Sequence, residues 1–471
     1  MDCRATKKHR YDLVVIGSGS ASFAAALRAS ELDKQVAMIE RATLGGTCVN
    51  IGCVPSKTLI RAAESKFRAE HSPFRGIDLH AAGLDFATLI REKDRLVDSL
   101  RQAKYQDVLQ SHDNIEFIAG EATFISPFEV RVGDRVLAGK YFLIATGATA
   151  RIPAVPGLSD TRFLTSTTLF EQERLPSSLA IIGGRFIALE LAQMMQRLGS
   201  RVTVLQRSEC ILPAEDADLT DALTGYLADE GITILTGVQL QQVSGNGTVC
   251  IDFKRRGKQQ RVEAEQLLVA AGRRADTSGL GLEQIGVELN KDSSVKTDEH
   301  CRTTVSHIYA AGDVSGNPAF VYTAAYEGKL AVDNAFGESR TKDFTILPYV
   351  VFTDPQVARV GLNEQMAREQ GLDVDVVKLA LENVPRALAA RDTRGFIKLL
   401  RKKGEDRLLG ASILAPEGSE LLMEVALVMR YRIPVHEVAG MLHPYLTLGE
   451  GIKLAAQAFD KDVKKLSCCA A

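Results

Sequence analysis

Residues 11–41 read YDLVVIGSGSASFAAALRASELDKQVAMIER, and this stretch decides the fold of the first part of the chain. An apolar strand, Leu13 to Ile16, runs into a glycine-containing turn, and a helical apolar pattern and a second apolar strand follow. Gly17 permits the tight turn, and Gly19 lets a pyrophosphate approach the backbone at the start of the helix. Glu40 ends the second strand, where an acid binds a ribose hydroxyl. This order predicts a dinucleotide-binding βαβ unit.

A second copy of this pattern covers residues 179–207, LAIIGGRFIALELAQMMQRLGSRVTVLQR. Arg185 stands where the second glycine is usual, so a pyrophosphate either sits differently or contacts the guanidinium group. No acid ends the second strand, and Gln206 and Arg207 follow it instead. Because an acid repels a 2′-phosphate and an arginine pairs with it, we expect NADPH rather than NADH, unless Arg207 is only a solvated surface charge.

Two dinucleotide folds in one chain predict two dinucleotides, and a flavin with a nicotinamide nucleotide is the obvious pair for passing electrons. Three further stretches place a glycine turn after an apolar strand, at the carboxyl edge where open α/β sheets bind ligands. They are LIATGATARIP (143–153), LLVAAGRRADT (267–277) and HIYAAGDVSG (307–316). We therefore expect an α/β protein with two Rossmann-like dinucleotide-binding domains and a C-terminal α+β domain.

The expected domain boundaries follow from these patterns. They are 1–150 for an FAD-binding domain with a cysteine pair, 151–275 for an NADPH-binding domain, 276–344 for a second part of the FAD-binding domain, and 345–471 for the C-terminal domain.

The composition excludes several classes of function. The 471 residues carry a net charge of −2, so nothing points to nucleic acid or an anionic membrane as a partner. No apolar run approaches the roughly 18 residues that a membrane span needs, and the first residues lack the apolar stretch of a signal peptide. We therefore expect a cytoplasmic protein, in which a close cysteine pair is more often catalytic or metal-binding than structural.

Cys48 and Cys53 lie in such a pair, GGTCVNIGCVPSK. A zinc site needs two more Cys or His ligands, and none lies nearby in the sequence. Pro55 is typical of the first turn of a helix, so we expect Cys53 beside a helix N-terminus, which lowers the pKa of a thiol. Lys57, one turn later, adds positive charge. A redox pair that accepts two electrons from a flavin is favoured over a metal clamp or a structural disulfide.

These motifs resemble those of the pyridine nucleotide–disulfide oxidoreductases, the family of glutathione reductase and dihydrolipoyl dehydrogenase, over nearly the whole chain. The resemblance implies FAD and NADPH as cofactors and a homodimer formed through the C-terminal domain. It implies that Cys53 is the thiolate facing the flavin and that Cys48 is the exchange thiol. Lys57 is implied to approach flavin N5 and to pair with Glu190, and Asp313 is implied to bind the ribityl chain.

Phe186 occupies the place of an aromatic gate over the nicotinamide pocket in this resemblance. The residues expected to bind the two cofactors are Gly17, Gly19, Ser20, Ala21, Glu40, Gly46, Thr47, Lys57, Ala122, Thr146, Gly147, Gly183, Arg185, Phe186, Glu190, Arg207, Gly272 and Asp313.

The C-terminal region departs from the disulfide reductases of this family. Those enzymes carry a histidine base in the pattern His-x-His-Pro-Thr-x-x-Glu, and the base supplies the proton that a leaving thiol needs. Here the stretch is LHPYLTLGEGIKLAAQAF, in which Tyr445 stands at the position of the base when Thr447 and Glu450 are aligned. His443 reaches that position only if the alignment with Glu450 is broken. A tyrosine, whose ordinary pKa is about 10, is a poor proton shuttle at neutral pH, so a substrate that needs no thiol protonation is favoured.

The chain ends in two adjacent cysteines, Cys468 and Cys469. Neighbouring cysteines rarely form a relaxed disulfide with each other. A chain end with two soft thiolates is suited to taking up a soft metal ion and passing it on, unless the tail is incidental. Together with the missing base, the tail favours reduction of a metal ion.

This combination resembles the branch of the family that reduces mercuric ion. Further stretches that resemble this branch are LRQAKYQDVL (100–109), NVPRALAARDTRGFIKL (383–399) and the SCC tail. It implies that Hg(II) arrives as a thiol complex and is reduced to Hg(0) by electrons from NADPH through FAD. The alternatives are a dihydrolipoyl dehydrogenase-like or other NAD(P)H-dependent disulfide reductase, and a flavin-bearing protein that holds mercury without turnover.

The same resemblance implies a site shared between the two subunits, with Tyr105 and Tyr445 near the bound metal. The tail of one subunit would deliver mercury to the cysteine pair of the other. The expected metal ligands are Cys48, Cys53, Cys468 and Cys469.

Overall fold

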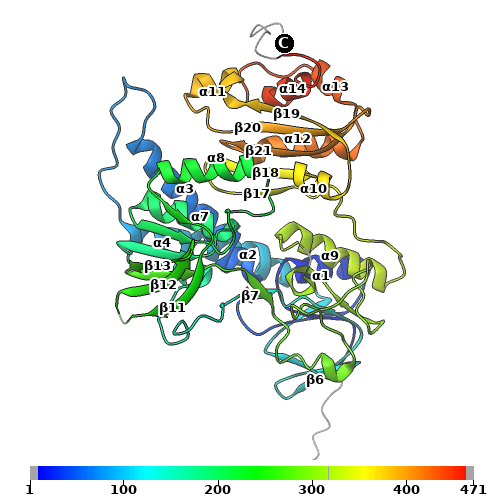
Figure 1. Ribbon diagram of the computed structural model, residues 1–471. Helices are drawn as coiled ribbons and strands as arrows, with labels where there is room; N and C mark the ends of the chain where they lie inside the picture. The colour runs from blue at the N-terminus through cyan, green and yellow to red at the C-terminus, as the bar shows by residue number, and fades with distance from the viewer. Residues whose placement is uncertain (1–8, 246, 317, 463–471) are drawn as a thin grey trace, which may run out of the picture.

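The computed structural model describes residues 9–245, 247–316 and 318–462 (Figure 1). Two α/β units occupy the lower part of this view, and a third unit, built from the last part of the chain, lies above them. The tail cysteines Cys468 and Cys469 lie outside the described residues.

The first unit is built on parallel strands in the order β3-β2-β1-β6. These strands are β1 (His9–Ile16), β2 (Val36–Glu40), β3 (Ile115–Ala119) and β6 (Arg135–Ile144). The short antiparallel strands β4 (Ala122–Ser126) and β5 (Glu129–Val132) extend the sheet beyond β6. A later segment returns to this sheet, where β16 (Ile308–Ala310) pairs in parallel with the end of β6.

Helices α1 (Ser20–Glu31) and α9 (Val321–Ala335) pack together against one face of this sheet (Figure 1). The two helices approach so closely that a Cβ atom added to Gly328 would lie 2.1 Å from the carbonyl oxygen of Ala21. Only glycine fits at that contact, which fixes the start of α1 beside the returning segment.

The second unit repeats the parallel arrangement in the order β10-β9-β8-β14. The strands are β8 (Ser178–Ile182), β9 (Arg201–Leu205), β10 (Thr233–Leu235) and β14 (Gln266–Val269). Helices α7 (Phe186–Leu198) and α8 (Ala217–Asp229) belong to this unit. Five further strands form an antiparallel sheet and a two-stranded ribbon: β11 (Gln239–Ser244), β12 (Val249–Arg255) and β13 (Lys258–Ala264), and β7 (Ala148–Ala150) with β15 (Arg273–Ala275).

The third unit is an antiparallel sheet in the order β17-β18-β21-β20-β19 with helices around it. Its strands are β17 (Tyr349–Val351), β18 (Gln356–Gly361), β19 (Val374–Ala380), β20 (Phe396–Lys402) and β21 (Leu408–Ala415). Its helices are α10 (Glu364–Glu369), α11 (Pro385–Ala390), α12 (Gly418–Arg430), α13 (Val435–Gly440) and α14 (Glu450–Gln457). The two parallel units and this α+β unit confirm the predicted fold class.

The remaining helices connect these sheets. They are α2 (Gly46–Ile51), α3 (Cys53–Glu70), α4 (Phe86–Arg101), the π-helix η1 (Gln102–Gln106), α5 (Asp107–Gln110), α6 (Ser166–Leu169), and the 3₁₀ helices η2 (Glu283–Ile285), η3 (Gly312–Ser315) and η4 (Leu381–Asn383).

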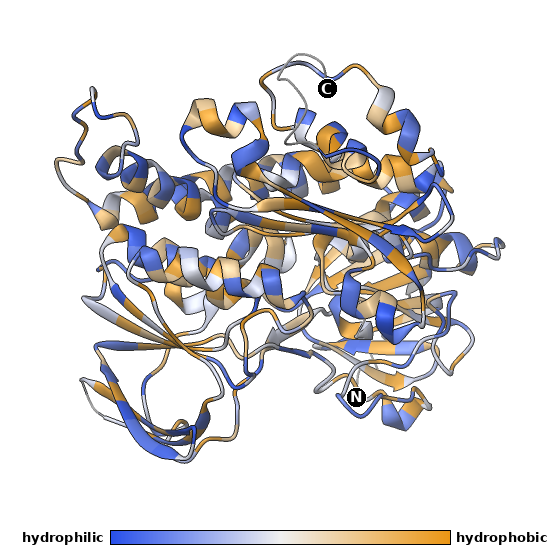
Figure 2. Cartoon of the chain, turned by 45° about the horizontal axis from the view of Figure 1, so that its top comes forward, coloured by the Kyte–Doolittle hydropathy of each residue, from blue (hydrophilic) through white to orange (hydrophobic). Residues whose placement is uncertain are grey.

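The strands of the two parallel sheets are mostly hydrophobic, whereas the β11–β13 sheet carries many hydrophilic residues, and hydrophilic residues also gather on the outward faces of the helices (Figure 2). Strand β8 is buried along its whole length, as expected for a parallel strand that is covered on both faces. Among the described residues, no helix combines the length and the apolar character needed to cross a bilayer.

Lys398 joins the second unit to the third. Its side chain is 1% exposed, and its Nζ lies 3.3 Å from Asp216, 2.7 Å from Asp218 and 2.6 Å from Glu364. The three carboxylates converge as a metal site would, but the ammonium group supplies the cation. Because Asp216 and Asp218 lie at the start of α8 while Lys398 lies on β20, the cluster fixes how the two units meet.

We predict that Lys398→Met lowers the free energy of unfolding by about 3 kcal/mol, because three partly buried carboxylates lose their counter-ion. Lys378→Met is the matched control, since Lys378 pairs with the same Asp218 but is 44% exposed, and it should cost no more than about 1 kcal/mol. Urea unfolding of both variants measures the difference. Equal losses in the two variants would contradict a role for the buried ammonium group.

Candidate active site

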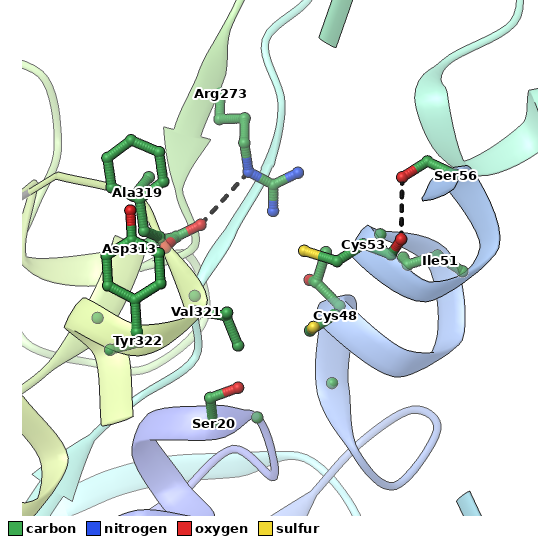
Figure 3. A pocket seen from close by; sticks show the side chains of 18 of the residues that line it. Ser20, Cys48, Ile51, Cys53, Ser56, Arg273, Asp313, Ala319, Val321 and Tyr322 are labelled. Carbon is green, nitrogen blue, oxygen red and sulfur yellow. Dashed lines mark hydrogen bonds and ion pairs between the residues drawn. The ribbon is translucent and has the colours of Figure 1, made fainter. Parts of the chain in front are cut away.

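The two cysteines of the GGTCVNIGCVPSK stretch lie on successive helices. Cys48 is in α2, and Cys53 is the first residue of α3. Gly52 separates the helices, and a Cβ atom added to it would lie 2.8 Å from the carbonyl oxygen of Thr47. The chain can therefore make the sharp turn between α2 and α3 only with a glycine at this position. Both sulfur atoms are directed into the same open space (Figure 3).

The two thiols have unequal acidity. The hydrogen bond with Cys48 and the positive charge of Lys57 together lower the pKa of Cys53 to about 6, against the opposing effects of burial and of Glu190. The same hydrogen bond, together with burial, raises the pKa of Cys48. At neutral pH, Cys53 is therefore a thiolate and Cys48 a thiol that donates to it.

Lys57 is held in place by a buried carboxylate. Its Nζ lies 2.7 Å from Oε2 of Glu190, whose side chain is 7% exposed. The other carboxylate oxygen of Glu190 accepts a hydrogen bond from the backbone N–H of Phe352 at 2.9 Å, and the ammonium group lies 4.7 Å from the centre of the Phe352 ring. The lysine thus keeps its charge beside the cysteine pair while residues from the second and third units hold it.

A cavity of about 720 Å³ opens beside the cysteines, which is large enough for much of a dinucleotide. Its far end is a backbone cradle, because a Cβ added to Gly17 would lie 2.4 Å from the carbonyl oxygen of Ala145 and one added to Gly46 would lie 2.6 Å from Cα of Gly19. Ser18 donates a 2.7 Å hydrogen bond to Glu40, which fixes the carboxylate at the end of β2. These residues fit a dinucleotide, since the N-terminus of α1 is suited to hold a pyrophosphate and the Glu40 carboxylate a ribose hydroxyl.

Most of the residues predicted to bind cofactors line this cavity. They are Gly17, Gly19, Ser20, Ala21, Glu40, Gly46, Thr47, Lys57, Thr146, Gly147, Phe186, Glu190 and Asp313, with Cys48 and Cys53 beside them. Ala122 lines a smaller adjoining pocket of about 50 Å³ together with Glu40 and Thr146.

The other four predicted residues lie at the carboxyl edge of the second parallel sheet and do not line the cavity. Gly183 follows β8, Arg207 follows β9, and Gly272 follows β14. Arg185 is the N-cap residue of α7, and both arginines are exposed. This edge faces the position that a second dinucleotide takes in such a unit.

Tyr105 lies in η1, a single π-helical turn that interrupts the helix running from α4 to α5. Its ring packs edge-on against Phe23 at 4.7 Å, and a Cβ added to Gly45 would touch it at 3.4 Å. Burial raises the pKa of Tyr105, and negative charge on Cys48 and Cys53 raises it further. The π-turn therefore directs this tyrosine toward the cysteine pair.

Tyr445 lies apart from the cysteine pair of its own chain. It precedes α14 at the far end of the third unit, whereas α2 lies in the middle of the molecule (Figure 1), and it does not line the cavity. Glu450 accepts a hydrogen bond from the backbone N–H of Leu446, and His443 is paired with Glu424 at 2.8 Å. Cys468 and Cys469 follow this region outside the described residues.

The sequence interpretation missed several residues of the cavity. Phe320, Tyr322 and Tyr349 stack beside Phe186, and Arg273 lies 3.4 Å from Asp313 on the wall opposite the cysteines (Figure 3). The aromatic residues of PAFVYT and LPYVV were visible as sequence, but only the fold brings them to one place.

Comparison with known proteins identifies the class. Residues 11–328 match the family described as pyridine nucleotide-disulphide oxidoreductase, and residues 347–456 match its dimerisation domain. The chain belongs to this family and is therefore an oxidoreductase that uses a flavin and a nicotinamide nucleotide. The family predicted from the motifs is confirmed.

Particular relatives are more specific. The chain is 44% identical to the mercuric reductase of Staphylococcus aureus over 98% of its own length and 84% of that protein, and 44% identical to the mercuric reductase of Streptomyces lividans over 98% of each. A solved structure of the HOCl-induced flavoprotein disulfide reductase RclA from Escherichia coli, in complex with Cu(II), superposes with a TM-score of 0.86 at 32% identity. The match covers 96% of this chain and all of that one.

We predict that the alkylation rate of the reduced protein follows a titration with a midpoint of about pH 6, because Cys53 is a thiolate above that pH. Lys57→Met should raise this midpoint toward the ordinary range of a thiol, since the stabilising charge is lost. Iodoacetamide labelling of the reduced protein across the pH range measures it, with Cys250→Ser as a control that removes an outlying thiol. An unchanged midpoint in the Lys57 variant would show that the ammonium group does not tune Cys53.

Proposed function

We propose that this protein reduces Hg(II) to Hg(0) with electrons from NADPH, using FAD bound in the large cavity. The proposal depends on the Cys48–Cys53 pair, which consists of one thiolate and one thiol and lies beside the dinucleotide cradle. In the same chain, Tyr445 stands where a disulfide reductase has a histidine base. The similarity to mercuric reductases over nearly the whole chain supports the same substrate.

A flavin bound in the cradle supplies the two-electron relay between the nicotinamide nucleotide and the cysteine pair. The reaction balances as one NADPH and one Hg(II) giving NADP⁺, Hg(0) and a proton. No thiol has to leave as a protonated product, which agrees with a site without a histidine base.

The cysteine pair has the chemistry to hold the metal. Mercuric ion prefers soft sulfur ligands, and two thiolates satisfy it. Cys53 is already ionised at neutral pH, and binding of the metal drives the proton from Cys48, since a coordinated thiol is deprotonated. Tyr105 lies beside the pair and offers a phenolic oxygen near the metal.

Delivery of the metal requires the second subunit in this proposal. Tyr445 lies in the unit that matches the family's dimerisation domain and does not line the cavity of its own subunit, and Cys468 and Cys469 follow it outside the described residues. Exposed apolar side chains mark this unit as an interface: Met423, Leu427, Tyr431, Met441, Leu442 and Leu446. Tyr445 and the Cys468–Cys469 tail of one subunit would then serve the Cys48–Cys53 pair of the other.

We predict that Cys48→Ala lowers mercury-dependent NADPH oxidation by about a hundredfold or more, because one of the two sulfur ligands at the reducing site is lost. Oxidation of NADPH with Hg(II) and excess thiol, with detection of volatile mercury, measures the activity. Cys250→Ala, on β12, is the matched control and should keep full turnover. Full turnover by the Cys48 variant would overturn the proposal.

We predict that Arg207→Ala raises the KM for NADPH about tenfold and leaves the KM for NADH nearly unchanged, because only NADPH carries a 2′-phosphate for the guanidinium to bind. Arg201→Ala, at the opposite end of β9, is the control for loss of a surface charge. Steady-state rates with both nucleotides separate the two cases. An equal effect on both nucleotides would show that Arg207 does not read the phosphate.

A second candidate function is reduction of a disulfide or of another soft metal ion. The similarity to a flavoprotein disulfide reductase solved with Cu(II) is the reason to test disulfides and Cu(II) as substrates. NADPH oxidation with lipoamide, glutathione disulfide and Cu(II), measured beside Hg(II), distinguishes these substrates.

A further inference from the structure

Four aromatic rings form a row along the wall of the cavity. Phe186 stacks on Tyr349 at 5.4 Å with an angle of 22° between the ring planes, Tyr349 stacks on Phe320 at 5.9 Å, and Phe320 stacks on Tyr322 at 5.3 Å. All four side chains line the cavity. We call this set the aromatic row, and its members come from the second unit, the first unit and the third unit.

The row lies on the route between the two cofactor positions. Phe186 directly follows the turn Gly183 to Arg185 at the carboxyl edge of the second sheet, and it also lines the cavity beside the cysteines. A nicotinamide ring that extends from that turn into the cavity has to displace the Phe186 ring. What holds the row in place therefore affects how the nucleotide binds.

Both tyrosines of the row are anchored through their hydroxyl groups: Tyr322 donates to the backbone carbonyl of Pro348, and Tyr349 donates to a charged side chain of the second unit. The Tyr349 hydroxyl group donates a hydrogen bond to Oε1 of Glu215, which is 4% exposed and lies in the loop before α8. Arg359 lies 4.8 Å from the centre of the Tyr349 ring, and its Nε lies 3.8 Å from Oε2 of Glu215. Neither Oε2 nor this Nε has a hydrogen-bond partner among the described residues, so the Tyr349 hydroxyl is the closest partner of the carboxylate.

The loop that carries Glu215 is itself fixed to the third unit. The carbonyl oxygen of Ala214 accepts hydrogen bonds from Arg359 at 3.2 Å and from Asn363 at 2.9 Å. Asp216 is held by Lys398 and by the backbone N–H groups at the start of α10. Glu215 therefore cannot follow Tyr349 if the ring moves, and the hydrogen bond acts as a fixed attachment point.

We propose that Glu215, with Arg359, is a positioning residue that latches the Tyr349 hydroxyl and thereby holds Phe186 in the path of the nicotinamide ring. The proposal rests on the proposed use of NADPH and goes beyond it, because it assigns a control on nucleotide entry to residues outside both nucleotide turns. None of the three latch residues belongs to a glycine-rich turn or to the cysteine pair.

The latch responds to pH through Glu215. The pKa of Glu215 is raised to about 7, chiefly by burial and to a smaller extent by the charge of Asp216, while the charge of Arg359 opposes the rise. The groups that face the carboxylate are Tyr349 from β17, Arg359 from β18 and Asp216 from its own loop. Above about pH 7 the carboxylate is charged and its hydrogen bond to the hydroxyl is strong, whereas below that pH it is protonated and the bond is weaker. The row is thus held more firmly as the pH rises.

The test is the affinity of the flavin-loaded protein for NADP⁺, measured by calorimetry at about pH 6 and about pH 8 without mercury. Glu215→Gln keeps the shape and remains neutral, so its Kd at the higher pH should be about fivefold lower than that of the unmodified protein. Because the 2′-phosphate of NADP⁺ also titrates in this range, the readout is the difference between proteins at each pH. That difference should vanish at the lower pH.

Tyr349→Phe removes the hydroxyl and keeps the ring, so it should lower the Kd at the higher pH by a similar factor. Adding Glu215→Gln to Tyr349→Phe should then change nothing more, since the two residues act through one bond. Asp229→Asn, at the exposed end of α8, is the control and should behave as the unmodified protein. Unchanged affinity in Glu215→Gln at both pH values, or additive effects of the two substitutions, would overturn the latch. Since no mercury is present, a failure of the proposed mercury reduction would leave these outcomes unaffected.

Discussion

Keeping a negative charge on Cys53 at neutral pH is the constraint on which the rest of the site depends. A cysteine thiol is ordinarily protonated at neutral pH, and the protein around it disfavours the charged form further by partly removing water. Here the hydrogen bond from Cys48, the start of α3 and the ammonium group of Lys57 act together against burial. Lys57 in turn is held by its ion pair with Glu190, and Glu190 is held by the hydrogen bond from the backbone N–H of Phe352. A single charged atom thus depends on contacts from all three units.

This dependence explains why the units are joined so firmly. The Lys398 cluster and the Glu215–Tyr349 bond both connect the loop before α8 to the third unit, and both use charged groups that would be costly to bury alone. A change in the relative position of the units would disturb these groups and the Lys57–Glu190 pair at the same time. The geometry of the cysteine pair is therefore stabilised by contacts well outside the cavity.

Much of this could be predicted from sequence because the governing signals are local. The glycines of the two nucleotide turns, the acid at the end of β2 and the Cys48–Cys53 spacing act through neighbours within one βαβ unit, and the fold and the family followed from them. The Lys57–Glu190 ion pair was expected only from resemblance. The roles of the tail cysteines remain predictions, because that segment lies outside the described residues.

The residues that were missed interact across long separations in sequence. Glu215 lies on a loop of the second unit, whereas Tyr349 and Arg359 lie on two strands of the third unit. No spacing rule connects an acid to a tyrosine more than a hundred positions away. Lys398 is similar, since a lysine in the strand FIKLLRK gives no sign that its head group is fully buried. Contacts of this kind depend on how units pack, which the periodicity of a single element does not encode.

The π-helical turn at 102–106 places a different kind of demand on the chain. In a regular helix each residue advances the direction of its side chain by about 100°, so one residue more or less in this turn would point Tyr105 away from the cysteines. The length of the segment between α4 and α5 is therefore under stricter control than its composition. By contrast, the length of the exposed loop between α3 and α4 does not set the direction of any side chain of the site. The chain can therefore gain or lose residues in this loop without altering the site.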